Sequence, residues 1–180
     1  MPAKALMVLR LVRRGTVAPH TEPVSVGVPL PCGAMRQPEL EAVAADGRAL
    51  PSQATVLARW PDGSVRWALL DLLVAAERSS EAQVEVRVRT GGAPAAAPIA
   101  LRELPGQYAV DTGAVRLEIT RDVFAPFAAL RCAEGVPSTA LHSALVFEDR
   151  RGRRLLPCLE SLAVEPGAVR LSFKIGRAHV

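Results

Sequence analysis

Aromatic residues are scarce in this 180-residue chain and make up only 4% of it. This counts against a nucleic-acid-binding protein, because proteins that bind single strands stack the bases on aromatic side chains. The net charge of +4 does not by itself indicate nucleic-acid binding. The arginine clusters, at residues 13–14 and 150–154, lie beside predicted turns, which is typical of solvated basic loops. We therefore expect no nucleic-acid partner, and a basic nucleic-acid-binding β-barrel stays only as an alternative.

Cysteine is also rare. The three residues Cys32, Cys132 and Cys158 include no C-x-x-C pair, so their number and spacing indicate neither a disulfide framework nor a zinc site. We expect three buried or half-buried thiols in a reducing compartment. No run of about 18 apolar residues is present, so we predict no membrane span and no membrane partner. The N-terminus shows no signal-peptide pattern, which favours a cytoplasmic location and leaves secretion open.

Catalytic signatures are missing as well. The chain contains no G-x-S-x-G, H-E-x-x-H, P-loop or G-x-G-x-x-G motif. His20 and His142 stand at no metal-ligand spacing from a Cys, Asp or Glu, so we expect no metal or cofactor and leave the role of both histidines open. A glycosidase needs two carboxyl groups about 5–10 Å apart, and the spacing of Asp111 and Asp122 establishes no such pair. We predict no catalytic residue in this chain.

Short apolar runs with a period of two dominate the first ninety residues, and they indicate β-strands. Residues 6–12 hold a single charge, so we expect this strand to be buried on much of both faces. Prolines on either side of residues 24–28 indicate a short strand or an edge strand. The other predicted strands are residues 40–44, 49–58, 65–73 and 83–89. About six short strands with little helical periodicity predict a small barrel or sandwich.

Both tryptophans lie in one stretch, residues 59–71, around the turn sequence Pro-Asp-Gly. Proline presets φ, and Asp and Gly tolerate the dihedral angles of a tight turn, so the stretch predicts a hairpin. Apolar residues occupy both faces of its second strand, which predicts a central strand covered on each side. Asp71, on the same face as Trp67, would then need an arginine or a backbone N–H as its partner.

Trp60 and Asp62 are the candidate ligand-binding residues. A tryptophan beside a turn can stack on a sugar ring through its apolar face, or it can close the end of a barrel. We favour barrel closing for Trp60, because large aromatic side chains are mostly buried. The turn itself explains Asp62, since Asp is common at such positions. The ligand-binding hypothesis stays open for both residues.

Two motifs in this chain point to a known module. The pattern G-V-P-h-P-x-G-A occurs at residues 27–34, and W-P-D-G-S-h-x-W follows at residues 60–67. In this order they resemble the N-terminal RIFT-barrel domain of rhamnogalacturonan exolyase-like proteins, over about residues 5–90. The resemblance implies a large multidomain polysaccharide lyase-like protein, in which the barrel precedes β-rich material and a helical toroid. It also implies β-elimination chemistry whose Tyr, His and Arg residues lie beyond the first domain, so none of these roles transfers to a residue here.

The remainder of the chain divides at a segment of Gly, Ala and Pro. Residues 91–98 show no periodicity and are interpreted as a linker after a barrel of residues 1–90. Alternation resumes at residues 108–111, 115–119, 144–148, 162–165 and 169–174, so residues 99–174 are expected to begin a second β-sandwich-like domain. Residues 175–180 look like one reading frame of a sequencing adapter. We expect a non-native tail there, with the natural chain continuing from about Lys174.

These observations predict an all-β protein made of a small RIFT-type barrel and the first strands of a second, truncated domain. The expected function is a non-catalytic structural or accessory domain of a bacterial, carbohydrate-active lyase-like protein that degrades pectin or rhamnogalacturonan. Its partners would be downstream domains of the same chain and a pectic oligosaccharide. The main alternative is a stand-alone carbohydrate-binding β module that uses Trp60.

Overall fold

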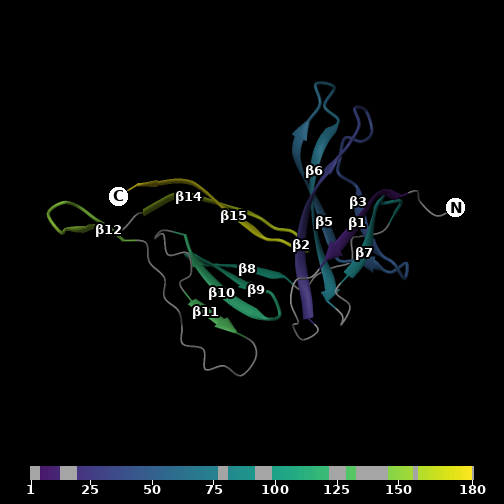
Figure 1. Cartoon of the computed structure of the whole chain (residues 1–180). Coiled ribbons are helices and arrows are strands. Elements are labelled where there is room, and N and C mark those ends of the chain that lie inside the picture. The colour runs from purple at the N-terminus through teal and green to yellow at the C-terminus, as the bar shows by residue number, and fades with distance from the viewer. Residues whose placement is uncertain are drawn as a thin grey trace. The chain divides into compact units, whose positions relative to one another are not determined.

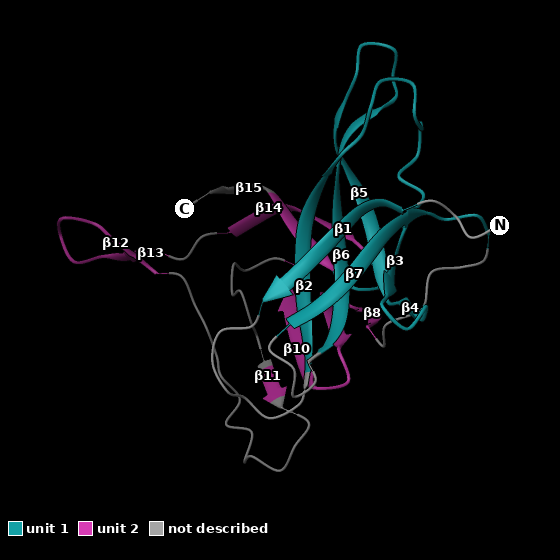
Figure 2. Ribbon diagram, turned by 45° about the vertical axis from the view of Figure 1, so that its right-hand side comes forward, with its two compact units in different colours: residues 1–97, 168–170 teal, residues 98–167, 171–180 magenta. Residues whose placement is uncertain are grey.

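The computed structural model describes residues 5–12, 20–76, 81–91, 99–121, 129–132, 146–155 and 158–179. Fifteen β-strands and no helix occur in this part of the chain, which confirms the prediction of an all-β protein (Figure 1). The chain forms two compact units (Figure 2). Unit 1 comprises Met1–Ala97 and Ala168–Arg170, and unit 2 comprises Pro98–Gly167 and Leu171–Val180. No helix that could cross a membrane occurs within the described ranges.

Unit 1 consists of two antiparallel sheets. The sheet with the order β1-β7-β3-β4 contains Ala5–Val12, Glu81–Val88, Leu40–Ala44 and Ala49–Leu50. The sheet with the order β2-β6-β5 contains His20–Pro29, Val65–Ala76 and Ser52–Arg59. The predicted edge position of β2 is confirmed, since among the described strands β2 pairs only with β6, although at ten residues β2 is longer than the predicted strand.

One apolar core is shared by the two sheets of unit 1. Leu40 on β3 and Val84 and Val86 on β7 meet Leu70 and Leu72 on β6, and each of these five residues is at most 1% exposed. Burying one such side chain contributes roughly 1.5–3 kcal/mol relative to leaving it in water. The alternation on β7 was predicted, because its valines occupy every second position and strand side chains alternate between faces.

The prediction that β1 is buried on both faces was wrong. Its side chains alternate strictly, and Met7 and Leu9 pack against the core. On the opposite face, Leu6, Val8 and Val12 are 46%, 52% and 61% exposed. The physical reason is that the core of unit 1 lies on one side of this sheet, so only every second side chain of β1 reaches it.

The prediction that β6 is covered on each side was also wrong for one of its faces. Its central position between β2 and β5 is confirmed, and Ala68 is fully buried on the core face. On the other face, Trp67 is 41% exposed and Leu69 is half-buried. We call this second face, with its neighbours on β2 and β5, the outer face of the sheet. Cover on the outer face is only partial, because the core of unit 1 lies on the other side of the sheet: Asp71 on the outer face is 3% exposed, whereas Trp67 is accessible.

Unit 2 contains eight described strands. A four-stranded sheet has the order β11-β10-β9-β8, with Ala129–Cys132, Val115–Thr120, Gln107–Asp111 and Ala100–Leu104. Two hairpins follow: β12 with β13, at Phe147–Glu148 and Arg154–Leu155, and β14 with β15, at Cys158–Glu165 and Ser172–His179. The strands predicted at residues 108–111 and 115–119 are confirmed, whereas β8 was not predicted.

Three expectations about chain organisation stay predictions. The linker falls outside the described residues, except for Gly91. Strand β15 includes residues 175–179, which pair with β14, but this pairing does not tell whether the tail is native. The limits of the natural domains are not tested by the division into compact units.

Candidate functional site

The predicted hairpin turn between β5 and β6 is closed by two backbone hydrogen bonds. The N–H of Trp60 donates to the carbonyl of Ser64 at 2.8 Å, and the N–H of Gly63 donates to the carbonyl of Trp60 at 2.9 Å. Gly63 has φ of +82°, a left-handed conformation that favours glycine because other residues place a Cβ near the following carbonyl. The turn therefore requires the Asp-Gly sequence that predicted it.

Asp62 accepts hydrogen bonds within this turn and from the loop that follows β2. Its Oδ1 accepts hydrogen bonds from the Ser64 backbone N–H at 2.9 Å and from the Ser64 hydroxyl at 2.6 Å. These two bonds lower the pKa of the Asp62 carboxyl below its ordinary value. The Ser64 oxygen also accepts from the Gly33 N–H at 2.9 Å, and Oδ2 of Asp62 accepts from the Cys32 thiol at 3.3 Å. Asp62 thus joins two loops, and its ligand-binding role stays a hypothesis.

The predicted burial of the cysteines was wrong for two of them. Cys32 and Cys158 are exposed, and the side chain of Cys132 lies outside the described part of the chain. Cys32 is exposed because it lies in the loop after β2. Its hydrogen bond to Asp62 raises the pKa of the thiol above its ordinary value. The protonated thiol is a poor nucleophile, so nothing indicates catalysis by Cys32.

The indole of Trp60 is held by two contacts within unit 1. Its Nε1–H donates to the carbonyl of Leu30 at 3.0 Å, and Leu30 itself is 4% exposed. The guanidinium of Arg66 lies 4.8 Å from the centroid of the ring. One edge and one face of the indole are therefore already in use, as expected for a residue that closes the end of a barrel.

Trp67 is the more accessible tryptophan. Its ring is 41% exposed on the outer face and lies across Gly27 of β2. A Cβ on Gly27 would come 3.5 Å from Cζ3 of the ring, an ordinary van der Waals contact. This exposed aromatic surface was missed from the sequence, because apolar residues on both faces of the strand had predicted cover on each side.

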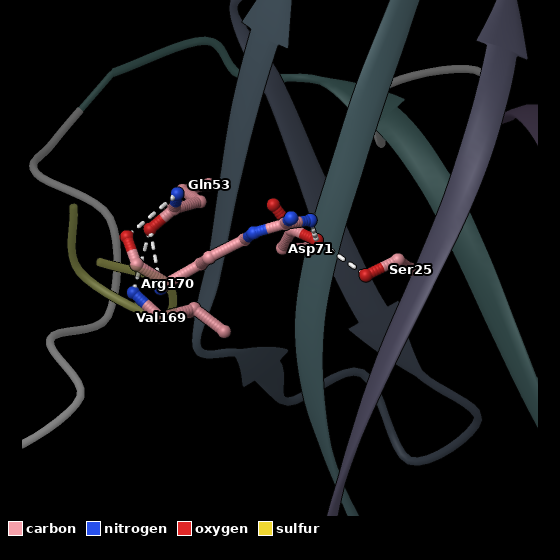
Figure 3. A network of polar contacts seen from close by, with 5 residues as sticks. All are labelled: Ser25, Gln53, Asp71, Val169 and Arg170. Atoms are coloured by element: carbon pink, nitrogen blue, oxygen red, sulfur yellow. Dashed lines mark hydrogen bonds and ion pairs between the residues drawn. The ribbon is translucent and has the colours of Figure 1, made fainter. Parts of the chain in front are cut away.

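A polar row crosses the outer face beyond Trp67. Ser25 on β2, Asp71 on β6 and Gln53 on β5 are register partners, and we call them the Asp71 row (Figure 3). Asp71 is 3% exposed, and its Oδ1 accepts from the Ser25 hydroxyl at 2.5 Å. The predicted arginine partner is confirmed: Nη1 of Arg170 lies 3.5 Å from the same oxygen. The hydroxyl partner was not predicted.

Residues 8–88 match the family model of the PcRGLX-like N-terminal RIFT barrel domain. Over these residues the chain is similar to the RIFT barrel of that family. The resemblance of residues 5–90 to that module is therefore confirmed. A comparison with curated protein sequences gives no match.

Gln53 of the RIFT barrel contacts a segment of chain that comes after the predicted linker. Its Oε1 accepts from the backbone N–H groups of Val169 at 2.7 Å and Arg170 at 2.8 Å. Its Nε2 donates to the carbonyl of Arg170 at 3.2 Å (Figure 3). Sequence reasoning missed this contact, because nothing in the local pattern around either partner marks a pairing across 117 positions.

The histidines and the other carboxylates do not form a site within the described ranges. Asp111 accepts from the Gly113 N–H at 2.8 Å and from Nε of Arg116 at 2.8 Å, so it stabilises the turn between β9 and β10. His20 begins β2, but its side chain is not described, and residues 122 and 142 lie outside the described part. No group of three or more His, Cys, Asp and Glu residues in that part could hold a metal ion.

Proposed function

We propose that the RIFT barrel is a non-catalytic structural domain of a carbohydrate-active, lyase-like protein that degrades pectin or rhamnogalacturonan. Its partners in this proposal are downstream domains of the same protein. The family assignment of residues 8–88 supports the class of protein. The accessory role is supported by one observation: Trp60 and Asp62, the candidate ligand-binding residues, make hydrogen bonds inside the barrel. In this proposal these hydrogen bonds stabilise the barrel as a scaffold.

Turnover by the purified chain tests the non-catalytic role. The chain is incubated with rhamnogalacturonan, and the unsaturated uronate that β-elimination produces is followed by its ultraviolet absorbance. A rhamnogalacturonan lyase run in parallel shows that the substrate is competent. We expect no product from the chain alone. Product that scales with the concentration of the chain would contradict the proposal.

A carbohydrate-binding module is the second candidate, and one observation favours it. The exposed ring of Trp67 lies over a glycine on a sheet face, where an apolar aromatic surface could stack on a sugar ring. This moves the candidate contact from Trp60 to Trp67. Titration of intrinsic fluorescence with pectic oligosaccharides distinguishes the two functions, with Trp60→Phe and Trp67→Phe as paired variants.

The two candidates predict different titrations. A structural domain shows no saturable change in the parent chain or in either variant. A binding module shows a saturable change that Trp67→Phe removes and Trp60→Phe preserves. A change lost only in Trp60→Phe would instead support the hypothesis that Trp60 binds the ligand.

A further inference from the structure

Asp71, on the outer face of the RIFT barrel, is a buried carboxylate with few polar partners. Its side chain is 4% exposed, yet among the described residues its Oδ2 atom has no hydrogen-bond partner. A buried carboxylate without sufficient partners is costly, because it has lost its hydration. Asp71 therefore depends strongly on the cation beside it. That cation is Arg170, whose own side chain is 51% exposed.

Gln53 binds the main chain of the segment that carries Arg170. Its side-chain amide accepts from two successive N–H groups and donates to one carbonyl of the segment Ala168–Arg170, which belongs to unit 1. These are main-chain groups, so Gln53 holds the segment without selecting its side chains. The selection falls to Asp71, toward which the Arg170 side chain extends (Figure 3).

We infer that the Asp71 row is a docking site for an arginine-bearing segment of backbone, occupied in this chain by Ala168–Arg170. Gln53 fixes the main chain and Asp71 binds the guanidinium. Ser25 is a positioning residue, because its hydroxyl binds the carboxylate atom that faces Arg170. The stability of the barrel is thereby coupled to sequence beyond the linker. The coupling does not depend on the proposed function, since it holds whether or not the parent protein acts on a polysaccharide.

The chemistry favours arginine over lysine at this position. A guanidinium offers five N–H donors in a planar fork, whereas an ammonium is a compact and strongly hydrated charge. The fork can donate to one carboxylate oxygen and retain donors for a second. Asp71 has that second oxygen, Oδ2, without a partner among the described residues. Lysine would neutralise the charge but would not match this geometry.

The test uses the whole chain and urea unfolding, followed by tryptophan fluorescence, because both tryptophans belong to the barrel. We expect Arg170→Ala and Gln53→Ala each to raise the unfolding equilibrium constant about ten-fold. Arg48→Ala is the matched control, since Arg48 is an exposed arginine of the same unit that is paired with Asp46. It should change the constant less than about three-fold.

The specificity of the site is tested by substitutions that preserve size or charge. Arg170→Lys should recover less than half of the loss, measured as free energy, that Arg170→Ala causes. In an Asp71→Asn background, Arg170→Ala should have less than a three-fold effect, because its charged partner is absent. Asn retains the shape and the Oδ1 acceptor of Asp, so this background is expected to fold.

Three results would overturn the inference. One is an effect of Arg170→Ala no larger than that of Arg48→Ala. Another is full recovery by Arg170→Lys, which would reduce the site to nonspecific charge neutralisation. The third is an undiminished effect of Arg170→Ala in the Asp71→Asn background. None of these results bears on turnover or on sugar binding, so failure here is distinguishable from failure of the proposed function.

Discussion

Trp60, whose indole N–H is hydrogen-bonded within unit 1, should be the tryptophan that is costly to replace. The perturbation is Trp60→Phe, which keeps an aromatic ring but removes the indole N–H. In the structure this N–H donates to the carbonyl of Leu30, a residue that is only 4% exposed. Trp67→Phe is the matched control, because Trp67 is 41% exposed on the outer face.

The expected magnitude follows from the contacts of Trp60. A buried carbonyl that loses its donor costs about 1–3 kcal/mol. The guanidinium of Arg66, 4.8 Å from the ring centroid, adds about 0.5–1 kcal/mol of cation–π attraction, part of which a phenylalanine would keep. We therefore expect Trp60→Phe to lower the free energy of unfolding by about 2 kcal/mol. Trp67→Phe, as a surface substitution, should stay within about 0.5 kcal/mol.

Urea unfolding of the two variants measures this difference. Each variant retains one tryptophan, so the remaining fluorescence reports unfolding of the barrel unit. A free-energy change of about 2 kcal/mol corresponds to roughly a 30-fold change in the unfolding constant, which such curves resolve easily. Equal effects of the two variants, or a larger effect of Trp67→Phe, would refute the assignment of Trp60 to barrel closing.

Three further predictions concern the core, the turn and its carboxylate. Leu70→Ala in the core should cost about 2–5 kcal/mol. The exposed Leu57→Ala on the adjacent strand should cost less than about 0.5 kcal/mol, and similar costs by urea unfolding would contradict the described core. Gly63→Ala, at φ of +82°, should lower the thermal midpoint, whereas Gly91→Ala, which meets no atom within 4 Å, should not. The folded pKa of Asp62 is lowered, so its contribution to stability is complete above the unfolded pKa of about 3.9 and is lost as the pH falls through the folded pKa. In Asp62→Asn the free energy of unfolding should therefore fall less steeply as the pH is lowered. A pH dependence equal to that of the parent chain would contradict a stabilising role for the Asp62 carboxylate.

Strand positions were predictable from the sequence because they depend on local patterns. The alternating valines of β7 placed Val84 and Val86 in the core, and the Asp-Gly pair located the turn at Gly63. The extent of cover was not predictable from the same patterns. Leu6 and Val8 lie in an apolar run, yet they are exposed, because the pattern does not tell whether another layer of chain packs on that face.

The Asp71 row shows the same limit for a polar site. Burial of Asp71 implied an arginine or a backbone donor, and that expectation was correct in kind. It did not identify Arg170 or Ser25, and it gave no role to Gln53. These residues come from three parts of the chain that are distant in sequence. Serine, glutamine and arginine are also common on protein surfaces, so their residue types did not mark them as partners of Asp71.

By itself, then, the sequence determined the all-β class, the hairpin around its Pro-Asp-Gly turn and the family of the barrel. These features depend on side-chain alternation and turn dihedral angles, which neighbouring residues set. Only the tertiary structure decided that the indole of Trp60 is hydrogen-bonded to Leu30 while Trp67 is exposed, and that Asp71 meets Arg170. The burial of a side chain and its hydrogen-bond partners depend on which distant segments pack together, and the local sequence pattern does not predict that packing.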